Sequence, residues 1–220
     1  TPLYSSAASD VYKRQVRMGQ VHAKTELGAW ITFISSLKDV HTIVDVGTWS
    51  GSGTTLCAAK GVRKKLSRDR NGTQIMGFEI DQSMVVKARR RLRGFRFVSV
   101  VYGSLVDSGE LDRSYLSPEE EGWFKADLEK MALAPVVLDQ APDKIDLLIL
   151  DGGEFSSQAE YFALRDRTSG WMVLDDITTR KNKKVFDLLA SDDLFSLVWV
   201  TRERNGAAIF LRSRSVTSFE

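Results

Sequence analysis

The sequence predicts an α/β fold in which helices cover both faces of a mostly parallel, seven-stranded sheet that ends in an antiparallel hairpin. Two observations lead to this prediction. Five short apolar runs alternate with segments of helical periodicity, which is typical of right-handed βαβ units. Near the end of the chain, Asn205-Gly206 separates two strand-like runs, and such a turn favours antiparallel pairing.

The first half of the chain supplies three strands and three helices. Apolar residues recur at helical spacing between Thr25 and Leu37, and Thr25 is a suitable N-cap. The next run is apolar, β-branched and bounded by Asp39 and Gly47, as expected of a buried strand. In order, we expect a helix over 25–37, a strand over 41–47, a helix from about 52 to 60, a strand over 73–81, a helix over 83–94 and a strand over 95–103.

The second half is less regular between residues 104 and 142, but it contains one clear helix start. Ser117-Pro118-Glu119-Glu120 combines a cap, a proline in the first turn and acids at the positive end of the helix dipole, and this helix should run to about Met131. After it we expect a strand over 144–153, a helix over 156–167, a strand over 170–177, a basic helix over 180–190 and strands over 195–203 and 207–213.

Length and composition describe one globular domain. The chain has 220 residues, 43% of them hydrophobic, and a formal net charge of +2, which gives no overall electrostatic reason to bind nucleic acid or a membrane. Cys57 is the single cysteine, so we expect a buried thiol and no internal disulfide. Because no apolar run is long enough for a membrane span and no signal peptide is seen, we expect a cytoplasmic protein.

The chain divides into three parts. Residues 1–15 show neither helical nor strand periodicity and begin without Met, and we interpret them as a non-native or disordered leader. Residues 16–213 form the predicted domain, and residues 214–220 form a tail.

Three glycines follow the first predicted strand in the run DVGTWSGSG, from Asp45 to Gly53. Glycine allows positive φ and lets a ligand lie close to the backbone. A P-loop would end in Gly-Lys-Ser/Thr, and no lysine is present; a dinucleotide loop would need G-x-G-x-x-G, which this spacing does not match. The pattern that remains is acid-x-Gly-x-x-x-Gly-x-Gly.

This pattern resembles motif I of the class I S-adenosylmethionine-dependent methyltransferases. The resemblance covers residues from about 20 to 212 and includes the acid Glu79 at the end of the second strand and the closing hairpin. Trp49 stands where the motif usually has its middle glycine, which is similar to the macrocin and cephalosporin-type O-methyltransferases.

The resemblance implies a Rossmann-like class I methyltransferase fold, S-adenosylmethionine as the cofactor and O-methylation of a hydroxylated small molecule or sugar. Glu79 would hold the two ribose hydroxyls, because a carboxylate can accept hydrogen bonds from both. The residues implied in cofactor binding are Asp45, Gly47, Thr48, Trp49, Gly51, Glu79, Ser104 and Asp151.

Acids also end the fourth and fifth predicted strands. If these strands are neighbours, Asp151, Asp175 and Asp176 converge, and a divalent cation would compensate their repulsion. A resemblance to metal-dependent O-methyltransferases implies these three as Mg²⁺ ligands; simple capping of the following helices is the alternative. Such enzymes place a lysine base three residues after the first ligand, whereas this chain has Glu154, so Asp151 and Glu154 are the catalytic candidates.

Other functions stay open. One is a metal-independent methyltransferase acting on nucleic acid or protein, one is a non-catalytic S-adenosylmethionine-binding module, and one is a NAD oxidoreductase, which the glycine spacing disfavours. For the arginine-rich helix at 83–94 we favour a solvated face over phosphate contacts. The basic run after the acidic pair, Arg180 to Lys184, would suit an anionic substrate. Neither the methyl acceptor nor the oligomeric state follows from the sequence.

Overall fold

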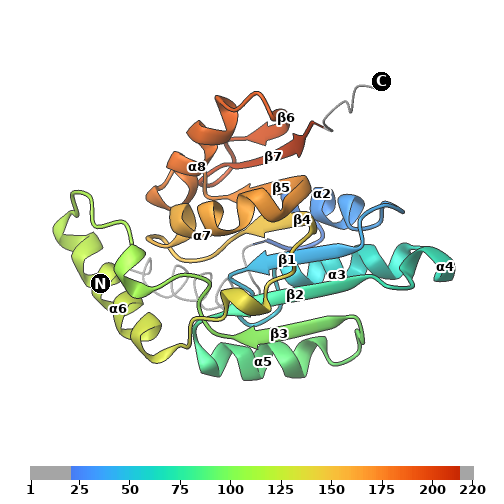
Figure 1. Cartoon of the computed structure of the whole chain (residues 1–220), viewed down its shortest axis with the longest axis horizontal. Coiled ribbons are helices and arrows are strands. Elements are labelled where there is room, and N and C mark those ends of the chain that lie inside the picture. The colour runs from blue at the N-terminus through green and yellow to red at the C-terminus, as the bar shows by residue number, and fades with distance from the viewer. Residues whose placement is uncertain (1–20, 214–220) are drawn as a thin grey trace, which may run out of the picture.

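The computed structural model describes residues 21–213, so the predicted leader (1–15) and tail (214–220) lie outside the described residues. Within this range seven strands form one sheet in the order β3-β2-β1-β4-β5-β7-β6, and only β7 runs against the others (Figure 1). The predicted sheet and its closing hairpin are confirmed. The strands are β1 (Thr42–Val46), β2 (Gln74–Glu79), β3 (Val98–Tyr102), β4 (Ile145–Leu150), β5 (Thr168–Asp175), β6 (Phe195–Thr201) and β7 (Ala207–Arg212).

The central strands are buried on both faces, which explains why their sequences are apolar without alternation. In β4, Leu147 and Ile149 belong to one core cluster, whereas Leu148 and Leu150 belong to the cluster on the opposite face. All four side chains are fully buried. This two-sided burial is what a parallel sheet between two layers of helices requires.

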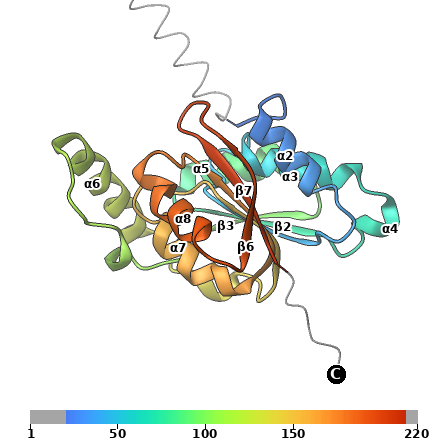
Figure 2. The same ribbon diagram turned by 90° about the horizontal axis from the view of Figure 1, so that it is seen from above.

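Helices cover both faces of the sheet, as Figure 2 shows from above. On one face lie α2 (Glu26–Ile34), α3 (Thr54–Lys64) and α5 (Gln82–Leu92); on the other lie α7 (Ser157–Leu164) and α8 (Arg180–Ala190). The long helix α6 (Pro118–Leu133) lies beyond the carboxyl ends of the parallel strands (Figure 1). The remaining short pieces are α4 (Ser67–Arg70) and the 3₁₀ turns η1 (Ser108–Glu110), η2 (Leu138–Gln140) and η3 (Arg165–Arg167).

The helix ends follow local capping chemistry. The Ser117 hydroxyl accepts from the backbone N–H of Glu120, and the Glu120 carboxylate accepts from the N–H of Ser117, so α6 begins with a capping box where predicted. In contrast, α3 extends four residues beyond its expected end at residue 60, because Gly61 and Val62 are still buried against the core. The basic segment between α3 and β2 contains the single turn α4.

The topology determines where a ligand can bind. From the centre of the sheet, β1 is followed outward by β2 and β3, whereas β4 and β5 extend in the opposite direction. Ligands of open α/β sheets bind beyond the carboxyl ends of the strands at such a reversal. The glycine run after β1 and the acids ending β2, β4 and β5 therefore meet at one edge. No helix among residues 21–213 is both long and apolar enough to cross a membrane.

Candidate active site

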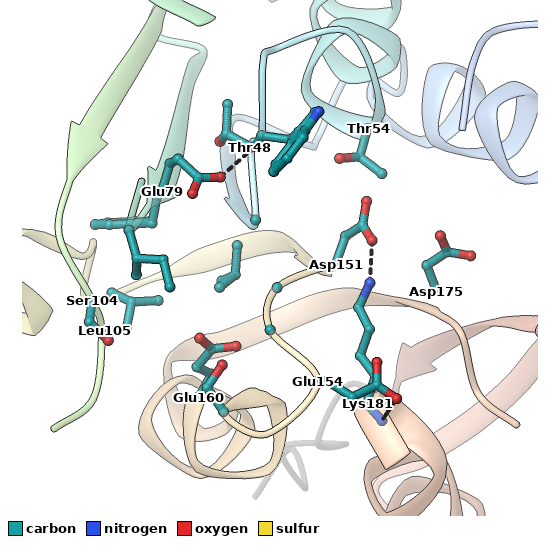
Figure 3. Close-up of a pocket in the computed structure, with 18 of the residues that line it drawn as sticks. Thr48, Thr54, Glu79, Ser104, Leu105, Asp151, Glu154, Glu160, Asp175 and Lys181 are labelled. Carbon is teal, nitrogen blue, oxygen red and sulfur yellow. Dashed lines mark hydrogen bonds and ion pairs between the residues drawn. The ribbon is translucent and has the colours of Figure 1, made fainter. Parts of the chain in front are cut away.

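A cavity of about 470 Å³ opens at the carboxyl ends of β1, β2, β4 and β5. Its wall contains the glycine turn after β1, the tips of these strands, and side chains from α6, α7 and α8. In the close-up of Figure 3, Glu79, Glu160 and Asp151 surround its centre, and Ser104 and Leu105 close one side. The volume is in the range typical of small-molecule sites.

The glycine turn is fixed by the backbone of the neighbouring strands. The N–H groups of Gly47 and Thr48 both donate to the carbonyl of Phe78, at 3.0 and 3.1 Å. Gly47 has φ of +88°, and a Cβ there would lie 2.2 Å from the carbonyl oxygen of Asp151. Only glycine fits this position, since both the conformation and the space exclude a side chain.

Gly51 and Asp45 shape the turn from outside the cavity. Gly51 has φ of +69° and lies against Ala88 of α5, where a Cβ would approach within 3.0 Å of the Ala88 Cα. Asp45 is fully buried and accepts hydrogen bonds from the hydroxyls of Thr54 and Thr55 at the start of α3. Burial raises the pKa of Asp45 to about 7. Asp45 and Gly51 are both predicted cofactor contacts, but neither residue lines the cavity.

Glu79 ends β2 with its carboxylate held in place by the backbone. One oxygen accepts from the N–H of Trp49 at 2.7 Å, and the other accepts from the N–H of Asp81 at 2.9 Å. Burial raises the pKa of Glu79 above its ordinary value. Each carboxylate oxygen can accept more than one hydrogen bond, so this fixed side chain can also accept from a ligand with two adjacent hydroxyls.

Trp49 takes a left-handed conformation with φ of +51°, which is uncommon outside glycine. Trp49 is 43% exposed and lines the cavity, while its backbone N–H donates to Glu79. Arg91 of α5 holds the next residue, because its guanidinium donates to the carbonyl and the hydroxyl of Ser50.

Ser104, a predicted cofactor contact after β3, lines the cavity, but its hydroxyl is used within its own loop. The hydroxyl donates to the carbonyl of Val106 at 2.7 Å. The Ser104 backbone also pairs with the segment before η2, accepting from the N–H of Val137. Ser104 therefore stabilises the cavity wall between β3 and α6 through bonds within the chain, and its hydroxyl is already engaged by Val106.

The predicted acidic cluster forms. Asp151, Asp175 and Asp176 each offer a carboxylate oxygen, and these atoms lie within 4.8 Å of one another. Burial and the charges of the other two acids raise the pKa of Asp175 to about 7. Asp176 has φ of +59°, so the chain turns sharply after β5 to bring its side chain back toward Asp151.

A lysine lies inside this cluster. The Nζ atom of Lys181, in the first turn of α8, is 2.6 Å from Oδ1 of Asp151 and 3.1 Å from Oδ2 of Asp176 (the Asp151 contact is dashed in Figure 3). The Lys181 side chain is only 8% exposed. Burial alone would lower the pKa of Lys181, but the charges of Asp151 and Asp176 outweigh it, so the pKa is raised and the ammonium stays charged.

A second cation reaches the cluster from the hairpin between β6 and β7. Arg204 Nη2 is 3.5 Å from Oδ2 of Asp175 and 3.9 Å from Oδ1 of Asp176. The turn is fastened to the loop after β5, since Ile177 N–H donates to the carbonyl of Gly206 and Thr178 N–H donates to that of Asn205. The terminal hairpin therefore brings a guanidinium to the site.

Glu154, the second catalytic candidate, also lines the cavity, and its carboxylate accepts from the backbone N–H of Lys181 at 3.3 Å. Glu160 of α7, which is not among the residues predicted from the sequence, is buried in the same wall. Its Oε2 has no hydrogen-bond partner among the described residues, and burial raises the pKa of Glu160 to about 7. A period-3.6 pattern alone cannot show that this acid faces the cavity.

The basic helix α8 does not present its charges to an anion. Arg180 pairs with Asp112 and Glu120, and Lys184 also pairs with Asp112. These contacts hold α8 against the segment that precedes α6 and against the first turn of α6. Among the residues lining the cavity, seven are acidic and two are basic, so the local field favours a cationic ligand over a phosphate. The acids are Glu79, Asp127, Asp151, Glu154, Glu160, Asp175 and Asp176, and the bases are Lys130 and Lys181.

No family model and no curated protein matches the sequence. Solved structures with the same fold do match. A proposed caffeoyl-CoA O-methyltransferase from Staphylococcus aureus is 13% identical, with a TM-score of 0.62, over 95% of this chain and 92% of that chain.

Two further matches contain a methyl-transfer cofactor or its product. An O-methyltransferase from Bacillus cereus in complex with SAH is 12% identical (TM-score 0.59, covering 94% of this chain and 90% of that one). The O-methyltransferase TomG from Streptomyces achromogenes, involved in tomaymycin synthesis and in complex with SAM, is 15% identical (TM-score 0.58, covering 94% and 88%). These matches confirm the predicted class I methyltransferase fold.

Proposed function

We propose that the protein is an S-adenosylmethionine-dependent methyltransferase that transfers the methyl group to a hydroxyl of a small molecule or sugar. The observation that carries this proposal is Glu79, whose two oxygens are each fixed by a backbone N–H at the tip of β2, facing a cavity of acidic character. A fixed carboxylate suits the vicinal hydroxyls of a ribose, and an acidic cavity suits a sulfonium.

The cofactor would lie across the tips of β1 to β4. The glycine turn and the first turn of α3 would receive the methionine end, because a helix N-terminus has free N–H groups and α3 has no side-chain cap. Glu79 would hold the ribose, and Ile80, Ser104 and Leu105 would surround the adenine. The methyl group would then point toward Asp151 and the acidic cluster.

Methyl transfer itself needs alignment and a proton acceptor. The hydroxyl oxygen of the acceptor forms the new O–C bond while the C–S bond breaks, and its electron pair stays on sulfur to give S-adenosylhomocysteine. The hydroxyl proton must leave, and Asp151 is the cavity carboxylate placed at the end of β4 to take it. Glu154, three residues on, accepts from α8 and positions Lys181.

Whether Mg²⁺ fits the acidic cluster depends on Lys181. Three carboxylate oxygens within 4.8 Å are suitable hard ligands by their chemistry. However, the Lys181 ammonium already bonds Asp151 and Asp176, and Arg204 lies beside Asp175. As folded, the site does not fit a divalent ion in addition to these cations, and no step of the proposed reaction uses one.

Transfer of a labelled methyl group tests the function. Purified protein with methyl-labelled S-adenosylmethionine should label hydroxylated small molecules, such as catechols or sugars, from a broad panel. RNA and protein acceptors form the rival arm. Label only in RNA or protein would replace the proposed acceptor class, and cofactor binding without transfer to any acceptor would point to a non-catalytic module.

A further inference from the structure

The position of Lys181 is fixed from two directions. Its backbone N–H lies at the start of α8, where the Thr179 hydroxyl and the Glu154 carboxylate both accept from it at 3.3 Å. Its side chain then runs into the acidic cluster and ends between Asp151 and Asp176. A buried lysine needs such charged partners, because an unpaired ammonium away from water is costly.

The charges of the cluster are nearly balanced without any ion. Asp151, Asp175 and Asp176 contribute three negative charges when ionised, and Lys181 and Arg204 contribute two positive charges. A divalent cation would have to push the ammonium away from the same oxygens. That exchange would leave a buried lysine without partners and place like charges a few ångströms apart.

We propose that Lys181 is the resident cation of the acceptor site and takes the place of a divalent metal ion. The role of Lys181 in methyl transfer rests on the proposed function, whereas its contacts with the acidic cluster do not depend on that function. An ammonium has three N–H groups, and side-chain hydrogen bonds within the described chain account for two of them. The third can donate to the acceptor oxygen and orient it toward the methyl group, so Lys181 acts by positioning.

Metal binding by the cluster gives a test that does not depend on activity. The variants Lys181→Met and Lys181→Ala remove the ammonium, and the three carboxylates remain. The matched control is Lys183→Met in the same helix, whose Nζ pairs with Asp187 on the surface. Mn²⁺ is the probe, followed by its electron paramagnetic resonance signal and by calorimetry.

We expect the wild type and Lys183→Met to bind Mn²⁺ only weakly, whereas both Lys181 variants bind one ion at least about tenfold more tightly, because a unit positive charge has been removed from beside the ligand oxygens. Mg²⁺ should likewise raise the melting temperature of Lys181→Ala and leave that of the wild type unchanged. In the wild type, methyl transfer should be insensitive to EDTA.

Two results would overturn the inference: tight Mn²⁺ binding by the wild type with Lys181 intact, or no gain of binding in either Lys181 variant that still shows a cooperative thermal transition. Calorimetry with S-adenosylmethionine on the same samples separates the two proposals. If the wild type does not bind S-adenosylmethionine, the proposed function is wrong. The Mn²⁺ comparison still decides whether Lys181 takes the place of a metal ion.

Discussion

The Nζ atom of Lys181 lies 2.6 Å from Oδ1 of Asp151, so an ammonium at the start of α8 holds the carboxylate at the end of β4. The pair joins the end of β4 to the first turn of α8 in the wall of the cavity. It also engages one oxygen of Asp151, a residue that lines the cavity.

Asp151→Asn keeps the shape of the side chain but removes the charge that would take the acceptor proton. We expect kcat to fall by about 10²- to 10⁴-fold, which is the usual size of a general-base effect. The affinity for S-adenosylmethionine should change much less. Initial rates and calorimetry on the same samples check this, with Asp187→Asn as a surface control. A variant with the wild-type rate would exclude Asp151 as the proton acceptor.

Glu79→Gln replaces an acceptor-only carboxylate with an amide that has one acceptor oxygen and two donors. The ribose hydroxyls would lose a charge-assisted hydrogen bond worth roughly 1.5–3 kcal/mol, so the affinity for S-adenosylmethionine should fall by roughly 10- to 100-fold. Glu129→Gln, an exposed position on α6, is the control. If both variants bind the cofactor equally well, Glu79 does not hold the ribose.

Glu160 makes stability depend on pH. Because burial raises the pKa of Glu160 from 4.5 to about 7, the folded protein keeps this proton over a range where the unfolded chain has lost it. Its contribution to stability is therefore complete below about pH 4.5 and is lost as the pH rises through about 7. Glu160→Gln should be more stable than the wild type at pH 8, by on the order of 3 kcal/mol, and nearly equal to it at pH 4.5.

Urea unfolding of both proteins at the two pH values, without ligand, measures this difference. Glu121→Gln, at an exposed position, should show no such change with pH. A stability difference for Glu160→Gln that is the same at both pH values would show that the carboxyl does not titrate as described.

Gly47→Ala and Gly72→Ala separate backbone strain from collision. Both glycines have positive φ, at +88° and +78°, but a Cβ at Gly72 meets nothing within 4 Å, whereas one at Gly47 meets the Asp151 carbonyl at 2.2 Å. We expect Gly72→Ala to cost about 1–2 kcal/mol of stability. Gly47→Ala should cost at least about 1–3 kcal/mol more and weaken cofactor binding. Equal losses in the two unfolding experiments would contradict the tight approach of the turn to β4.

The layered fold follows from the sequence because its signals are local. The apolar run of β4, the capping box at Ser117 and the Asn205-Gly206 turn each depend on residues a few positions apart. The acidic cluster was predicted on the condition that the fourth and fifth strands are neighbours, because the carboxyl ends of adjacent parallel strands lie at the same edge of a sheet. The structure meets this condition, since β4 pairs with β5.

The partners of the cluster could not be predicted in this way. One basic run contains Lys181, Lys183 and Lys184, and of these three only Lys181 pairs with the acidic cluster. The other two pair with Asp187 and Asp112, which lie outside that cluster. The difference depends on the angle at which α8 packs on the sheet. Arg204 reaches Asp175 only because the hairpin turn is fastened to the loop after β5, a contact between segments far apart in the sequence.

Calorimetric titration of the wild-type protein with S-adenosylmethionine and S-adenosylhomocysteine tests the central claim most directly. We predict that each binds at one site, with a Kd at the micromolar level, or about −8 kcal/mol, and that NADH does not bind. No heat of binding for either compound up to millimolar concentration, from protein with a cooperative unfolding transition, would contradict the assignment of this cavity to a methyl-transfer cofactor.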